Sequence, residues 1–139
     1  RYAEPIDFTE GLPSFASIDV SFISLNLILP ALAKILVDGG QVVALVKPQF
    51  EAGRKQIGKN GIVREISVHE KVLETVTAFA VDYGFSVKGL DFSPIQGGHG
   101  NIEFLAHLEK TSSPHNDAQT SIKEVVAQAH KEFKKNEEE

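Results

Sequence analysis

Apolar and polar positions follow a strand, helix, strand order in the first third of the chain. Residues 14–20 form a short apolar run that predicts a buried strand. Residues 24–37 carry apolar side chains at helical spacing, and Pro30 requires either that the regular helix begin just before it or that the helix kink. Residues 41–46 are a nearly continuous, partly β-branched run, which is typical of a parallel strand covered on both faces.

The second half of the chain predicts one long loop, one helix and two more strands. Residues 48–64 are rich in glycine and basic side chains, which is typical of a loop long enough to be functional. Residues 67–70 match the Ser-x-x-Glu capping box and open a helical pattern of apolar positions. Residues 85–92 and 102–109 have the composition and bounds of strands.

The connector between these last two strands decides their direction. It comprises residues 93–101, whereas a parallel crossover needs a dozen or more residues and usually a helix. We therefore expect the two strands to be antiparallel. In a right-handed α/β sheet, the carboxyl ends of the earlier strands and the start of this last strand then lie at the same edge.

Three charged residues stand at that edge, each at the end or start of an apolar run: Asp19, Lys47 and Glu103. We expect them to form an acid–lysine–acid cluster. A lysine amine between carboxylates can act as a general base or steer an oxygen lone pair, while the carboxylates orient it or hold the proton. For any single pair, the alternative is a strand-end ion pair without a catalytic role.

The composition is that of an ordinary globular protein, with 42% hydrophobic and 24% charged residues. A length of 139 residues fits one domain with its own core. The formal net charge of −5 argues against a protein that coats nucleic acid through a broad basic surface, but it leaves room for a local basic patch. The absence of cysteine suits a reducing compartment, so we expect a cytoplasmic protein.

Several classes of site are not expected. The longest apolar run, residues 20–37, is interrupted by polar side chains, so no membrane-spanning helix is predicted. The five histidines lack metal-ligand spacing, so no metal site is predicted. We interpret His69 and His107 as structural and leave His99 unassigned. Residues 110–139 predict a polar linker and a narrow amphipathic helix that docks on the domain, on an absent neighbour or on a partner.

Four motifs in order resemble the TlyA family. This family is named for haemolysin but consists of S-adenosylmethionine-dependent ribosomal RNA 2′-O-methyltransferases with an FtsJ-like catalytic domain. The resemblance covers the chain up to about residue 108. The motifs are Asp19-Val-Ser-Phe-Ile-Ser-Leu25, Val46-Lys-Pro-Gln-Phe-Glu51, Gly61-Ile-Val-Arg64 with His69 after it, and Gly100-Asn-Ile-Glu-Phe-Leu105.

The resemblance implies the distal half of a Rossmann-like methyltransferase sheet, with two parallel strands, an antiparallel hairpin and a C-terminal helix. Residues 1–109 would be a partial methyltransferase domain and residues 110–139 the linker and helix. The family's glycine-rich cofactor loop has no counterpart here, and the chain lacks methionine. We therefore expect a processed or truncated piece that is inactive alone. The missing half or a second copy would cover the edge strand at residues 14–20.

The resemblance also implies roles for individual residues. Asp19, Lys47 and Glu103 match the second, third and fourth members of a Lys-Asp-Lys-Glu tetrad, whose first lysine is absent. Lys47 would be the base, Glu103 would orient it, and Asp19 would lie on the methyl-donor side. The cofactor candidates are Asp19, Val20, Ser21 and Phe22. The candidates for contact with ribosomal RNA are Gln49, Arg54, Lys55, Lys59 and Arg64.

Alternatives stay open at this stage. The chain could be a non-catalytic RNA-binding or assembly module, and the family's name also suggests a membrane-lysing protein, although no basic amphipathic or spanning segment supports that. Phe22 and Phe50 either border the cofactor or stack on a base, or they belong to the core. Gln49 and Glu51 are equally compatible with functional and structural roles. The basic loop could simply be solvated.

Overall fold

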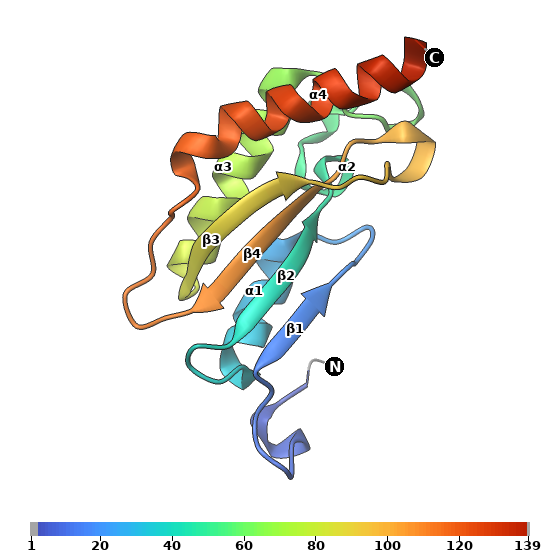
Figure 1. Cartoon of the computed structure of the whole chain (residues 1–139). Coiled ribbons are helices and arrows are strands. Elements are labelled where there is room, and N and C mark those ends of the chain that lie inside the picture. Colours follow the sequence, from blue (N-terminus) through green and yellow to red (C-terminus); the bar gives the residue numbers. More distant parts are fainter. Residues whose placement is uncertain (1–2, 139) are drawn as a thin grey trace.

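Helices and strands form close to where the apolar pattern predicts them. The computed structural model describes residues 3–138 and has one four-stranded mixed sheet with helices packed against it (Figure 1). The strands are β1 (Phe15–Ile18), β2 (Gln41–Val46), β3 (Phe85–Phe92) and β4 (Phe104–Lys110). The α-helices are α1 (Leu25–Ile35), α2 (Pro48–Glu51), α3 (Ile66–Asp82) and α4 (Ile122–Glu138).

The strand order β1-β2-β4-β3 confirms the expected topology. β1 and β2 are parallel, whereas β4 lies between β2 and β3 and is antiparallel to both. Val46 pairs with Phe104 in this register. Lys47 and Glu103 are therefore the next residues outward on neighbouring strands, at one edge of the sheet. Residues directly opposite one another in an antiparallel pair point to the same face, so the register brings the two side chains to one side.

The first helix forms within its predicted range of residues 24–37. α1 begins at Leu25 and runs through Pro30, so of the two alternatives for the proline, the later start is not observed. Ser24 is the N-cap, and its Oγ accepts a hydrogen bond from the Asn26 N–H at 3.0 Å. The Leu25 N–H donates to the Glu51 carboxylate at 2.8 Å. These acceptors satisfy donors at the helix start, which offsets the hydrogen bond that the proline removes inside the helix.

α3 begins before its predicted capping box, so this predicted helix start is wrong. Its N-cap is Glu65, which makes no side-chain capping bond, so Ser67 lies inside the first turn. The segment predicted as a loop at residues 48–64 also contains α2 and two 3₁₀ turns, Arg54–Gln56 and Lys59–Gly61. The remaining 3₁₀ turns are Pro5–Asp7, Gly98–Gly100 and Gln119–Ser121. Local sequence patterns therefore locate these segments but not their ends.

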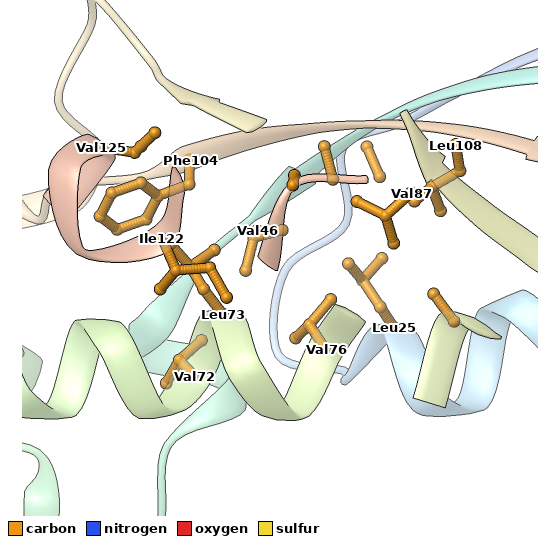
Figure 2. Close-up of a cluster of buried hydrophobic side chains, with 14 of the residues drawn as sticks. Leu25, Val46, Val72, Leu73, Val76, Val87, Phe104, Leu108, Ile122 and Val125 are labelled. Carbon is orange, nitrogen blue, oxygen red and sulfur yellow. The ribbon is translucent and has the colours of Figure 1, made fainter. Parts of the chain in front are cut away.

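One face of the sheet carries the core. The even-numbered residues of β2, and those of β4 up to Leu108, are buried against α1, α3 and α4, and Figure 2 shows Val46, Phe104 and Leu108 facing Leu73 and Leu25. The opposite face is less covered, because Val43 is 37% exposed and His107 is also exposed. The prediction that both faces of the strand at residues 41–46 are covered is therefore wrong for residues 3–138.

Two histidines join α4 to α3. His69 is fully buried, and its Nε2 lies 3.0 Å from the carbonyl oxygen of Val63. A carbonyl only accepts, so Nε2 carries the proton and Nδ1 of the neutral ring is an acceptor. His130 Nε2, at 2.7 Å, must then donate to His69 Nδ1. Burial lowers the pKa of both rings, and that of His69 falls to about 4. The interior position of His69 agrees with a structural role.

We expect acid to destabilise this packing. The folded-state pKa of His69 lies below its unfolded value of 6.5, so the unfolded chain binds the proton more readily. The stabilisation is therefore present above pH 6.5 and is lost as the pH falls towards about 4, with a maximum effect of ~3 kcal/mol. His69→Gln should flatten the pH dependence of the unfolding free energy measured by urea denaturation. His107→Gln, on an exposed strand position, is the control, and equal slopes for both variants and the parent would contradict the assignment.

Candidate functional site

A cleft of about 690 Å³ opens at the edge where β1 and β2 end and β4 begins. Three parts of the chain line it: the turn after β1, the segment from the end of β2 to the second 3₁₀ turn, and the connector between β3 and β4. The lining residues are Ser21, Phe22, Lys47, Gln49, Phe50, Ile57, Asn60, Gly61, Gly97, Gly98, His99, Asn101 and Glu103. The edge predicted from the short connector is therefore the edge that carries a cleft.

Lys47 lies at the junction of β2 and α2. It is the N-cap of α2, with Pro48 in the first turn, and its side chain is only 11% exposed. The ammonium nitrogen is 2.5 Å from Asp19 Oδ1 and donates to Ser21 Oγ at 3.3 Å. It also lies 6.0 Å from the centre of the Phe50 ring. These contacts hold the cation between the ends of β1 and β2, facing the cleft.

Glu103 approaches the cleft from the other strand. It directly precedes β4, is 7% exposed, and accepts a hydrogen bond from Gln49 Nε2 at 2.8 Å. Its carboxylate makes no ion pair with Lys47 among the described residues. The three charged residues thus meet at one edge as expected, but Glu103 directly positions Gln49 and not Lys47. The Oε1 atom of Gln49 is buried without a hydrogen-bond partner.

Gly97 lets the connector lie directly on the Glu103 carboxylate. A Cβ atom at this position would overlap Glu103 Oε2, so only glycine fits without displacing the acid. The neighbouring Gly98 has open space around its Cα. The backbone conformation of Gly97 is open to any residue, with φ of −80°. The close approach, and not conformational freedom, therefore requires glycine here.

Unusual backbone conformations concentrate around this cleft. Within residues 3–138, the non-glycine residues in the left-handed region are Phe22, Asn60 and His99, with φ of 65°, 66° and 58°. All three line the cleft. Such conformations cost on the order of 1 kcal/mol or more, and they cluster at functional sites because other contacts hold them in place. Phe22 is the most unusual, since a bulky side chain rarely adopts this region and its side chain is 90% exposed.

Asn101 fixes the wall of the cleft, and the sequence analysis assigned it no role. Its Nδ2 donates to the carbonyls of Gly61 and Gly98 at 3.0 Å each, and its Oδ1 accepts from the Val63 N–H at 3.0 Å. The side chain is 2% exposed. It therefore ties the basic loop to the β3–β4 connector. A signal was available, because a polar residue at the start of an apolar strand has to find buried partners.

Glu51 has a structural role. It accepts hydrogen bonds from Ser24 Oγ at 2.6 Å and from the Leu25 N–H at 2.8 Å, so its carboxylate lies at the start of α1. Burial raises its pKa, and the two hydrogen bonds oppose that shift. A carboxylate near a helix N-terminus is favourable because of the exposed N–H groups and the helix dipole. Glu51 does not line the cleft described above.

The other predicted site residues divide into two groups. Ser21, Phe22 and Gln49 line the cleft, whereas Val20 packs against the hydrophobic core. The basic residues of the loop are all exposed, and none lines this cleft: Arg54, Lys55, Lys59 and Arg64. Phe22 and Phe50 contact one another, with ring centres 4.8 Å apart. Both aromatic residues are thus at the cleft, and the basic loop contributes part of its wall without its basic side chains.

The described part of the chain contains neither a metal-binding cluster nor a membrane-spanning helix. No group of three or more histidine, aspartate or glutamate side chains has an arrangement that would hold a metal ion. No helix between residues 3 and 138 has the length and apolar character needed to cross a membrane.

Proteins of known name match much of this chain. YqxC of Bacillus subtilis, which carries a provisional name as an rRNA methyltransferase, is 54% identical over 137 residues, covering 96% of this chain and 49% of YqxC. TlyA of Mycobacterium tuberculosis, a 16S/23S rRNA (cytidine-2′-O)-methyltransferase, is 38% identical over 90 residues, covering 65% of this chain and 34% of TlyA. The chain thus spans about half or less of the length of these relatives.

A solved structure matches the fold over almost the whole chain. It comes from Streptococcus thermophilus and has a provisional hemolysin name. It is 93% identical, with a TM-score of 0.97, and the match covers 99% of this chain and 50% of that chain. The profile of the FtsJ-like methyltransferase family matches residues 1–110. This match covers most of the chain, and with the TlyA and YqxC similarities it establishes that the chain belongs to the FtsJ-like methyltransferase family.

Proposed function

We propose that the complete gene product carrying this chain methylates the 2′-hydroxyl of a ribose in ribosomal RNA, with S-adenosylmethionine as the methyl donor. The observation that carries the proposal is the position of Lys47, a mostly buried amine 2.5 Å from Asp19 on a cleft that Glu103 also lines. The relative TlyA is named for 2′-O-methylation of ribosomal RNA. In this proposal, the chain supplies the half of the site that holds the nucleophile.

The cleft has features that fit the methyl donor. When bound, S-adenosylmethionine supplies a methyl group on a positively charged sulfur. The Glu103 carboxylate faces the same cleft, and a carboxylate attracts a cation. Asp19 and Ser21 remain the proposed donor-side residues, whereas the ring of Phe22 is assigned to the target base. Val20 would contribute through its backbone, because its side chain belongs to the core.

Lys47 would activate the ribose. A 2′-hydroxyl is a weak nucleophile, and attack on a methyl group requires that the oxygen be aligned and lose its proton as the new bond forms. Lys47 in its amine form would take that proton: the O–H bond breaks as the O–C bond forms, and the bond between the methyl carbon and the donor's sulfur breaks, so that the demethylated donor leaves as a neutral thioether. Asp19, whose side chain is 65% exposed, passes the proton from Lys47 to water. Glu103 acts through Gln49, because it accepts a hydrogen bond from Gln49 Nε2 at 2.8 Å and so holds that side chain at the wall of the cleft.

The aromatic pair would hold the target base. Phe22 is 90% exposed, which supports a binding role over a core role. Its ring contacts Phe50 and lies on the same cleft as Lys47. Base stacking on aromatic side chains contributes about 1–3 kcal/mol per base and tolerates any sequence. A base stacked there would bring its own ribose towards the amine.

We expect Lys47→Arg to lower methyl transfer by at least ~100-fold, because a guanidinium cannot deprotonate at a workable pH and general-base catalysis contributes 10² or more. The measurement is incorporation of a labelled methyl group into ribosomal RNA by the complete gene product. Lys71→Arg, at an exposed position of α3 outside the cleft, is the control. A Lys47→Arg enzyme that retains more than a third of the parent rate would remove Lys47 from the chemistry.

Gly97 and Gly98 offer a matched pair of variants. Gly97→Ala should displace the Glu103 carboxylate and lower the turnover number by roughly 10- to 100-fold, because small misplacements of site groups cost rates of that order. Gly98→Ala adds the same methyl group one residue away in open space and should leave turnover within about twofold. Equal activity of both variants would show that the position of Glu103 does not matter.

Phe22→Gly should separate stability from activity. Glycine relieves the left-handed backbone, so the unfolding free energy should stay constant or rise by up to ~1 kcal/mol despite the lost ring contact. Methyl transfer should fall by about tenfold or more if the ring stacks on the target base. Ile66→Ala removes another exposed apolar side chain, at the start of α3 and outside the cleft, and should not affect methyl transfer. Thermal unfolding and methyl incorporation are measured on the same preparations, and a Phe22→Gly protein with unchanged activity would refute stacking.

A further inference from the structure

A second groove lies next to the catalytic cleft, and its walls come from three separate segments. It has a volume of about 350 Å³ and lies between residues 62–64, residues 96–102 of the connector and the last described turns of α4. Its charged lining residues are Arg64 from the loop and Lys134 from α4. Among the side chains that the structure describes, no aspartate or glutamate lines the groove. The groove is therefore locally basic in a chain with a net charge of −5.

The two cations of this groove are free to bind a ligand. Arg64 and Lys134 are both exposed, and neither makes an ion pair with a described residue. By contrast, Lys88 and Lys110 are each close to an aspartate. Burial lowers the pKa of the nearby His130, which favours its neutral form, so the groove's positive charge does not depend on that histidine.

His99 borders both the groove and the cleft. It lines both cavities and is exposed. Its backbone is left-handed, at the point where the connector passes between the two cavities. The cavities are therefore neighbours, and a chain-like ligand that passes over His99 would reach both of them, whereas a compact ligand would occupy only one.

We propose that this groove binds the phosphodiester backbone of the RNA strand next to the nucleotide that enters the cleft. The identification of the strand as RNA rests on the proposed function. Arg64 and Lys134 each neutralise a phosphate charge, which releases counterions and favours binding without reading sequence. α4 thereby gains a role: it packs on α3 through buried side chains and presents Lys134 to the substrate.

The test is RNA affinity as a function of salt. The complete gene product is titrated with a fluorescein-labelled single-stranded RNA, and anisotropy is followed between about 50 and 200 mM KCl. The Arg64→Ala/Lys134→Ala double variant should bind roughly tenfold more weakly near 100 mM. Its plot of log affinity against log salt should be shallower by about 1.4, since each phosphate contact on a single strand contributes ~0.7. Lys134→Glu should weaken binding more than Lys134→Ala.

Lys123→Ala is the matched control. It removes an exposed lysine from the same helix, eleven residues earlier and ~16 Å away along the axis. A double variant that matches this control in affinity and in salt slope overturns the inference. Thermal unfolding of each variant confirms that the substituted side chains, which are exposed, leave the fold intact.

Methyl incorporation by the same proteins separates this inference from the proposed function. If the parent protein methylates RNA and the double variant binds RNA as tightly as the parent, the proposed function stands and the role of the groove is refuted. If the parent protein binds RNA through Arg64 and Lys134 but transfers no methyl group, the role of the groove stands and the proposed function is refuted.

Discussion

β4 runs antiparallel between β2 and β3, and its register sets Val46 opposite Phe104. That pairing decides which side chains can meet, because Lys47 and Glu103 follow it outward on neighbouring strands. A slip of one residue in β4 would turn Glu103 to the opposite face, since side chains alternate along a strand. The core side chains Phe104, Ala106 and Leu108 would turn with it, so the same hydrophobic burial that stabilises the sheet also fixes the register of the site.

The wall of the cleft combines unfavourable local conformations with strong local restraints. Each left-handed non-glycine residue costs on the order of 1 kcal/mol or more, and the orphaned Gln49 Oε1 adds a desolvation cost. Asn101 opposes these terms with three hydrogen bonds, each with a net contribution of about 0.5–1.5 kcal/mol. The three hydrogen bonds of Asn101 therefore offset part of the strain, and the packing of the surrounding structure offsets the rest.

The sequence allowed the sheet to be predicted better than the helix starts or the contacts. The bounds of β2 and β3 follow from apolar runs, and the short connector implied an antiparallel β4 because chain length limits what a crossover can span. The Leu25 N–H at the start of α1 donates to Glu51, which is distant in sequence, and no local pattern contains that contact. The choice of Gln49 over Lys47 as the partner of Glu103 also depended on side-chain geometry that only the folded structure specifies.

Val63 links the cleft to the C-terminal helix. Its N–H donates to Asn101, which shapes the cleft, and its carbonyl accepts from His69, which in turn accepts from His130 of α4. A displacement of α4 would therefore weaken the support of the basic loop as well as remove Lys134 from its groove. Both cavities share His99 and a loop held by the same short hydrogen-bonded chain. α4 is thus part of the structure that shapes the cleft, although none of its described side chains lines it.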